Sequence, residues 1–380
     1  MRPARPIIAI SGGIALILVT MASTVSAPTS SRPGTVPPSA RPPADALIAQ
    51  SPARSGPEVA PGALADVSRA FGHELEPALA PEGAPLRASP EPPDEPAMSI
   101  DGAAAPTGDP PSATILVAGD IASCAWQADS ATARLVEDLP GVVMTAGDNA
   151  YGEGTYRQFR DCYHPTWGRF RERTRPTPGN HDWYTTGARG YFRYFGDLAG
   201  PADRGYYAFD AGPWRVYALT SDCSQVGGCR KGSPQHTWLK QDLVENPDSC
   251  VLAVWHHPRF SSGPHGDSKR PLALLQRLYR SGADVVVNGH DHFYERFAPA
   301  GPDGTLDRTH GIRQFIVGTG GGPLYRVQEP FARNSRVRDA TSHGVLRLTL
   351  AADRYTWEFL PVPGDTLRDS GSGTCHAPPP

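Results

Sequence analysis

Short apolar runs that are each followed by a polar signature recur from residue 113 onward. Four of them have the length and apolar character of buried strands: residues 113–118, 141–146, 250–254 and 284–287. Three stretches between them have the pattern of helices: residues 130–139, 233–244 and 271–280. A strand at 314–317 and an antiparallel pair at 344–350 and 355–360 follow. Strands that alternate with helices are typical of a layered α/β domain.

Polar side chains stand directly after most of these predicted strands. Open α/β sheets gather functional groups at the carboxyl ends of their strands, so we expect the clusters to meet at one edge. Each cluster alone is ordinary turn chemistry, but all five in one order favour a site. The clusters are Gly119-Asp120, Gly147-Asp148-Asn149-Ala150-Tyr151, Gly179-Asn180-His181-Asp182, Trp255-His256-His257-Pro258 and Gly289-His290-Asp291-His292-Phe293-Tyr294-Glu295-Arg296.

The residue types in these clusters indicate a metal site. Carboxylate, amide and imidazole ligands suit iron, zinc or manganese rather than copper(I). The ligands are numerous enough for two metal ions bridged by one carboxylate. Two metal ions roughly 3.5–4 Å apart clamp a phosphoryl group and generate hydroxide near neutral pH. The pattern therefore predicts chemistry on phosphate esters.

With these motifs, residues 113–322 resemble the calcineurin-like metallophosphoesterase superfamily and, within it, the purple acid phosphatase branch. The resemblance implies a four-layer α/β/β/α sandwich with the dimetal site at the strand ends. It also implies the ligand roles. Asp120 and His292 would bind the first metal, Asp148 would bridge, and Asn180, His256 and His290 would bind the second metal.

The first metal shows a departure from the superfamily pattern. Most members have a histidine two residues after the first aspartate, where this chain has Ala122. In the purple acid branch a tyrosine three residues after the bridging aspartate is the ligand instead, and Tyr151 stands there. A phenolate implies iron(III) and a visible colour, with zinc, iron or manganese as the second metal. The alternative for Tyr151 is a packed aromatic near the site. The branch has glycine at position 122, which implies a small difference in local backbone.

The resemblance implies hydrolysis of phosphate monoesters, like an acid phosphatase, by attack of a metal-bound hydroxide. His181 is the first candidate for protonating the leaving group, with Asp182 orienting it. His265, in the loop 261–266, is the second candidate, with an exposed loop histidine as its alternative reading. Glu295 and Arg296 are expected to make structural pairings rather than to touch substrate. A phosphodiesterase, a nucleotidase, a phospholipid-cleaving enzyme and a non-catalytic binding module remain alternatives.

The first 111 residues have a different composition. Residues 28–111 contain 19 of the 41 prolines, and Phe71 is the single aromatic residue before position 112. Residues 1–27 have the layout of a secretory signal peptide, but the uncharged stretch 7–27 is also long enough for a retained membrane anchor. We expect 28–111 to be a disordered linker and 112–376 to be the catalytic domain.

Export is the expected consequence, either to the cell surface and exterior or to a periplasm. Six cysteines in an exported chain favour disulfides. Cys223 and Cys229 suit a small closed loop. The other pairings stay open, with Cys124–Cys162 and Cys250–Cys375 as the suggested ones. A net charge of −3 gives no basic footprint for nucleic acid, and the partner we expect is a small phosphate ester. The oligomeric state stays open.

Overall fold

The computed structural model of the chain describes residues 112–380, except 203 and 248. The predicted signal or anchor at 1–27 and the predicted linker at 28–111 lie outside the described residues. Within the described part, no helix has both the length and the apolar character needed to cross a membrane.

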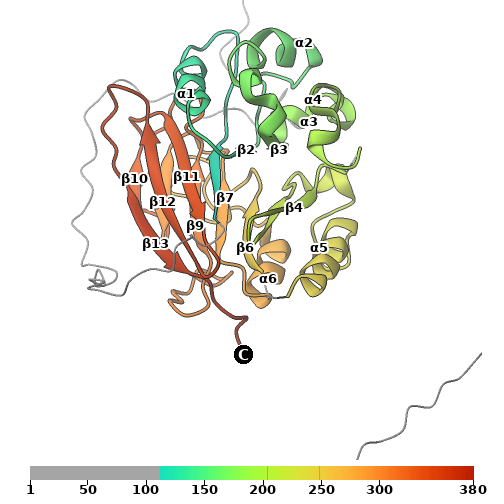
Figure 1. The fold of residues 1–380 in the computed structure, drawn as a ribbon, viewed down its shortest axis with the longest axis vertical. Helices are drawn as coiled ribbons and strands as arrows, with labels where there is room; N and C mark the ends of the chain where they lie inside the picture. Colours follow the sequence, from blue (N-terminus) through green and yellow to red (C-terminus); the bar gives the residue numbers. More distant parts are fainter. Residues whose placement is uncertain (1–111, 203, 248) are drawn as a thin grey trace, which may run out of the picture. The chain divides into compact units, whose positions relative to one another are not determined.

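Two β-sheets form the centre of the described domain (Figure 1). One has six strands in the order β13-β12-β11-β1-β2-β3, and the other has seven in the order β10-β8-β9-β7-β6-β5-β4. The strands are β1 (Ala113–Ala118), β2 (Val142–Ala146), β3 (Thr174–Thr177), β4 (Tyr207–Ala211), β5 (Trp214–Ala218), β6 (Cys250–Val254), β7 (Val285–Asn288), β8 (Tyr294–Phe297), β9 (Arg313–Val317), β10 (Ser335–Asp339), β11 (Gly344–Leu350), β12 (Arg354–Pro361) and β13 (Ser370–Thr374).

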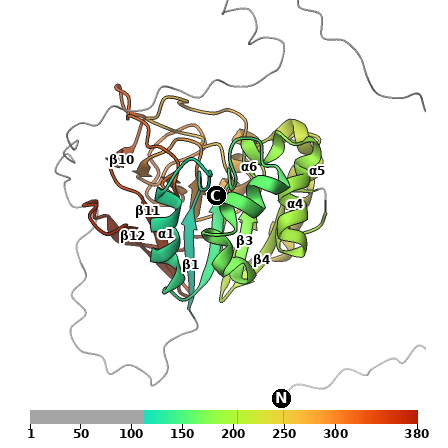
Figure 2. The same ribbon diagram turned by 90° about the horizontal axis from the view of Figure 1, so that it is seen from above.

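Helices cover the outer faces of the two sheets (Figure 2). Apolar side chains of α5 and α6, such as Leu239 and Leu278, pack on the seven-stranded sheet in one core cluster. Ala133 and Val136 of α1 pack on the six-stranded sheet in the core that also fills the space between the sheets. The α/β/β/α sandwich expected from the resemblance is confirmed. The helices are α1 (Ala128–Glu137), α2 (Tyr156–Gln158), α3 (Asn180–Trp183), α4 (Arg189–Phe195), α5 (Pro234–Glu245) and α6 (Leu272–Arg280).

The predicted strands and the three predicted helices are present with ends shifted by a few residues at most. The strands that the pattern missed are β3, β4, β5, β8, β10 and β13. Several of these are short or polar, and β3 consists of Thr-Arg-Pro-Thr, which has no apolar alternation. Pairing with a neighbouring strand, rather than local propensity, makes such segments extended.

Parallel strands bring the polar clusters together. In the six-stranded sheet β1, β2 and β3 run parallel, and in the seven-stranded sheet β5, β6, β7 and β9 do. Their carboxyl ends therefore lie at one edge in each sheet. Asp120 and Asp148 follow β1 and β2, whereas His256 and His290 follow β6 and β7, so both sheets contribute to the site. Asn180 follows the missed strand β3.

Three disulfides lie within the described residues. The structure contains Cys223–Cys229, and it also contains the two suggested pairings, Cys124–Cys162 and Cys250–Cys375. No cysteine of the described residues is left free. The last of these bonds ties the C-terminal tail to the start of β6.

Candidate metal centre

Three of the predicted ligands have a backbone conformation that side chains seldom adopt. Asp120, Asp148 and His290 have φ angles of 60°, 49° and 74°. Each stands in the first turn after a strand, where the chain reverses sharply. A left-handed conformation at a non-glycine residue costs of order 1–3 kcal/mol and persists where the surrounding structure enforces it. Such strain concentrates at functional sites, and here it turns three ligand side chains toward one point.

Glycines before these residues allow the loops to approach closely. A Cβ atom on Gly179 would lie 2.2 Å from Oδ1 of Asp148. Gly147 combines a φ of +87° with a position where a Cβ would lie 2.5 Å from Nδ1 of His256. Any larger residue would push the loops apart, so the glycines fix the spacing of the site.

Tyr151, Asp120 and His292 form one group of potential ligands. The Tyr151 hydroxyl donates to Oδ1 of Asp120 at 2.9 Å and lies 2.9 Å from Nε2 of His292. Nδ1 of His292 lies 2.9 Å from the carbonyl of Pro323, so the ring presents Nε2 to the group. All three side chains are buried. The phenol oxygen therefore lies among ligand atoms instead of packing as an aromatic beside them.

Asp148, Asn180, His256 and His290 form the second group. Nε2 of His256 lies 3.2 Å from Oδ2 of Asp148 and 3.3 Å from Nδ1 of His290. Asp120, Asp148 and His256 each offer an atom, and these atoms lie within 4.8 Å of one another. The two groups are thus adjacent, with Asp148 beside the second and close to the first.

Asn180 supplies a direct test of whether a metal ion fits. Its Oδ1 atom is buried without a hydrogen-bond partner among the described residues. Its amide nitrogen donates to the Tyr184 hydroxyl at 3.2 Å, which turns Oδ1 the other way. A buried acceptor without a donor is costly, and a cation satisfies it. The donor set of carboxylate, amide, imidazole and phenol atoms also fits iron or zinc.

The electrostatics of the cluster favour positive charge. Burial alone would lower the pKa of His256, but the carboxylate of Asp148 outweighs it and raises the pKa of His256 to about 10. For Asp148, burial opposes ionisation, but His256 and His181 lower its pKa below the ordinary range. The carboxylates therefore stabilise a cation at this point, which is the role that a metal ion would fill.

His181 and His265 both line the pocket over these groups, which also includes Asn180, His290 and His292. The centre of the His181 ring lies 4.3 Å from the centre of the Tyr151 ring. Nε2 of His181 lies 3.9 Å from Oδ2 of Asp148. The ring of His265 lies 4.1 Å from that of His290. His181 therefore lies beside Tyr151 of the first group, and His265 lies beside His290 of the second. His265 lines the pocket and is not a solvent-exposed loop residue.

Asp182 does not take the orienting role that we expected of it. Its carboxylate accepts hydrogen bonds from the backbone of Gly179 and from the backbone and side chain of Asn149, at 2.9–3.3 Å. The carbonyl of Gly152 lies 2.6 Å from Nδ1 of His181 instead. Asp182 stands three residues after Gly179 in the position that caps helix α3, so it fixes the turn that carries Asn180.

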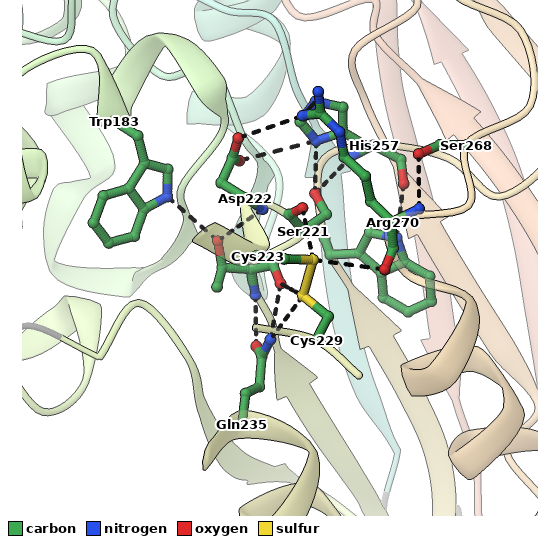
Figure 3. The surroundings of a disulfide bond; sticks show 11 residues. Trp183, Ser221, Asp222, Cys223, Cys229, Gln235, His257, Ser268 and Arg270 are labelled. Carbon is green, nitrogen blue, oxygen red and sulfur yellow. Dashed lines mark hydrogen bonds and ion pairs between the residues drawn. A yellow bond between two sulfur atoms is a disulfide. The ribbon is translucent and has the colours of Figure 1, made fainter. Parts of the chain in front are cut away.

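The ring of His257 lies beside that of the proposed ligand His290, with ring centres 4.2 Å apart, and both its nitrogens bond to side chains drawn around the Cys223–Cys229 disulfide (Figure 3). Its Nε2 accepts from Arg270 at 2.9 Å, which leaves Nδ1 to donate to the Ser221 hydroxyl at 2.8 Å. Burial and the neighbouring His256 hold the pKa of His257 well below its ordinary value. A neutral ring with both nitrogens bonded supports the ligand loop from behind.

Residues that sequence reasoning missed surround the ligands. Glu295 and Arg296 make structural contacts on opposite faces, because successive residues of β8 alternate in direction. Arg296 pairs with Asp369 at 2.9 Å, and Glu295 accepts from the backbone and hydroxyl of Ser262. Asp291 accepts from His265. Both acids were visible within the last motif, but their partners come from a loop about 30 residues earlier, which no local pattern reveals.

Comparison with known proteins agrees with this geometry. A family profile described as "Calcineurin-like phosphoesterase" matches residues 113–294. Purple acid phosphatase 15 of Arabidopsis thaliana is 28% identical over 219 residues, which are 48% of this chain and 40% of that protein. Purple acid phosphatase 21 of the same plant is 28% identical over 271 residues, which are 61% and 56% of the two chains.

Solved structures show the same fold. A purple acid phosphatase from yellow lupin (Lupinus luteus) seeds superposes with a TM-score of 0.60 at 17% identity, over 70% of this chain and 54% of that one. GAP50, described as the anchor in the inner membrane complex of Plasmodium, superposes with a TM-score of 0.53 at 12% identity, over 70% and 89%. This chain spans about half the length of the two plant phosphatases it matches. Residues 113–294 thus match the calcineurin-like phosphoesterase family, and the chain is similar in sequence to purple acid phosphatases and shares the fold of one of them.

Proposed function

We propose that this chain is an exported dimetal phosphatase that hydrolyses phosphate monoesters. The observation that supports this most is the meeting of seven predicted ligands from five separate loops at one edge of the two sheets. The fold alone supports it less, because a relative described as an anchor has the same fold. The ligand set is complete, which favours a catalyst over a binding module.

We assign Asp120, Tyr151 and His292 to the first metal and Asp148 to the bridge. Asn180, His256 and His290 hold the second metal. When bound, the two ions supply Lewis acidity toward the phosphate oxygens and an activated water as the nucleophile.

The histidines at the mouth of the site handle the proton. Departure of the alcohol breaks a P–O bond and leaves an alkoxide oxygen that needs a proton. His181, held through Nδ1 by the Gly152 carbonyl, presents Nε2 on one side. His265, held through Nδ1 by Asp291, presents Nε2 on the other. Both histidines line the same pocket, together with Asp148, Asn180 and His292.

Tyr151 makes iron(III) the ion we propose at the first site, with zinc, iron or manganese at the second. A phenolate is a hard anionic ligand and matches a trivalent cation. The three disulfides support the proposed export, since such bonds persist in oxidising compartments. Residues 1–27 are the proposed signal or anchor.

Hydrolysis of p-nitrophenyl phosphate and of its bis-ester by the purified full chain tests this function. We expect turnover of the monoester, loss of turnover after chelation, and recovery when iron with zinc or manganese is restored. Faster turnover of the bis-ester would instead support the phosphodiesterase alternative. Absence of turnover on both esters by protein with two bound metals per chain would contradict the proposal.

A further inference from the structure

Two buried carboxylates hold the loop 261–266 against the end of the last motif. Asp291 stands between the ligands His290 and His292, and Glu295 follows in β8. Oε2 of Glu295 accepts from the backbone of Ser262 at 2.9 Å, and Oε1 accepts from its hydroxyl at 2.5 Å. Both carboxylates are completely shielded from solvent. Glu295 contacts Ser262 in this loop, whereas Asp291 also contacts the ring of His265. Glu295 is therefore a structural anchor, and Asp291 can act on the chemistry through His265.

Asp291 contacts the ring of His265. Its Oδ1 accepts from Nδ1 of His265 at 2.9 Å and lies 3.3 Å from the backbone nitrogen of the same residue. Its Oδ2 accepts from the Ser261 hydroxyl, and that hydroxyl oxygen accepts from the backbone of Gly263 at 2.9 Å. Each oxygen of Asp291 therefore has a donor from this loop, and the plane of the carboxylate is fixed.

The loop approaches Asp291 too closely for any side chain at Gly263. A Cβ atom there would lie 2.3 Å from Cγ of Asp291 and 2.5 Å from Cε1 of Phe293. This contact brings the His265 ring to 4.1 Å from the His290 ring and 5.7 Å from the Tyr325 ring. The ring is thus held between Asp291 on one nitrogen and the pocket on the other.

We propose that Asp291 is a positioning residue for leaving-group protonation, acting through His265. Its carboxylate keeps the proton on Nδ1, so that Nε2 is the nitrogen that faces the substrate. The carboxylate also fixes the orientation of the ring, as the buried aspartate does in a serine protease triad. This inference rests on the proposed phosphatase function.

Atoms and charges balance in this proton transfer. In the imidazolium form both ring nitrogens carry a proton, with the Nδ1 proton donated to Asp291. As the ester P–O bond breaks, its electron pair stays on the leaving oxygen, and the Nε2 proton of His265 moves to that oxygen. The products are the alcohol and a neutral His265 that still donates through Nδ1 to Asp291. Solvent returns the proton to Nε2 before the next turnover.

Two substrates separate this role from a structural one. The p-nitrophenolate group leaves readily without protonation, whereas the alkoxide of glycerol 2-phosphate does not. A residue needed for protonation should matter for the alkyl ester much more than for the aryl ester. A residue that only builds the loop should affect both esters alike. The ratio of the two kcat values therefore reports the role.

The experiment measures kcat and KM on both substrates for Asp291→Asn, His265→Ala, the double variant and Glu295→Gln, with metal content determined for each. For His265→Ala we expect a loss in kcat of roughly 10²–10³ on glycerol 2-phosphate and less than about tenfold on p-nitrophenyl phosphate. For Asp291→Asn we expect a loss of about 10–100-fold on the alkyl ester and about threefold on the aryl ester. The double variant should match His265→Ala alone, because Asp291 acts through that ring.

Glu295→Gln is the matched control, since it alters an equally buried carboxylate that holds the same loop without contacting His265. We expect it to change both substrates by the same factor. If Asp291→Asn does not fold, Ser261→Ala removes one donor to Asp291 and should show the same preference with a smaller loss.

An equal loss on both esters for Asp291→Asn, or a loss that multiplies with that of His265→Ala, would overturn the inference while leaving the phosphatase proposal intact. Absence of turnover by the metal-loaded wild type would contradict the phosphatase function itself. The two failures are therefore distinguishable.

Discussion

The loops that carry the ligands and the loop that carries His265 reach the same pocket by different means. Each ligand loop is the turn directly after a strand, begins with or lies beside a glycine, and has its geometry set by the backbone. The loop 261–266 has no such strand in front of its histidine, and side chains from a distant motif hold it in place. In this comparison the proposed metal ligands are placed by the strand ends, whereas His265 is placed by tertiary contacts.

Replacement of a proposed metal ligand should have the largest effect on activity. Asp148→Ala removes the proposed bridge, and we expect kcat/KM to fall by roughly 10⁴ or more with loss of bound metal. Elemental analysis and p-nitrophenyl phosphate turnover measure both. Asp161→Ala, at an exposed aspartate paired with Arg160, is the control and should change neither. Full metal occupancy in Asp148→Ala would remove that residue from the ligand set.

Removal of a disulfide should lower the free energy of unfolding without changing the metal content of the folded protein. Cys250–Cys375 closes a loop with a sequence separation of 125, against 6 for Cys223–Cys229. Chain entropy predicts losses of about 5 and about 2 kcal/mol in the free energy of unfolding when each pair is replaced by serine. Denaturant unfolding checks the ranking. Loss of metal from the folded Cys250/Cys375 variant would argue against a ligand site determined by strand ends.

Asp182 tests whether side chains also help to place a ligand loop, because its carboxylate caps the turn that carries Asn180. Asp182→Ala leaves three buried N–H donors of Gly179 and Asn149 without their acceptor, and we expect a loss of roughly 4 kcal/mol in unfolding free energy. Occupancy of the second metal should fall more than that of the first. The exposed Asp197 gives the control variant Asp197→Ala. A normal second-metal occupancy would show that Asn180 is placed by other contacts.

Glu295, the carboxylate that anchors the loop 261–266, should make the stability depend on pH. Burial raises the pKa of Glu295 from 4.5 to about 7. The folded state therefore binds the proton more tightly, so stability is greatest below pH 4.5 and falls as the pH rises through 7. We expect this loss to reach roughly 3 kcal/mol in wild type relative to Glu295→Gln. Unfolding curves of both proteins between pH 4 and 8 measure it, and a pH-independent difference would refute it.

Much of the fold, and the meeting of the proposed ligands at the strand ends, could be predicted from the sequence for a local reason. A buried strand such as 250–254 is apolar throughout, and the histidine that follows it stands out at once. The strand β3 was not predicted because its sequence lacks an apolar pattern. Its pairing with β2 makes it extended, and that pairing is not visible in the local sequence. Asp291 and Glu295 escaped for a related reason, since their partners Ser261, Ser262 and His265 become neighbours through the fold. The expected role of Asp182 was wrong because a helix cap and a histidine partner look alike in sequence.

The central claim is that Tyr151 is a metal ligand in a two-metal site, and one measurement tests it most directly. Metal content and the visible absorption spectrum are recorded on the purified full chain and on Tyr151→Phe. We predict two metal ions per wild-type chain, at least one of them iron, with a visible charge-transfer band that Tyr151→Phe abolishes. Iron-containing wild type without such a band, or a band that survives in Tyr151→Phe, would contradict the account.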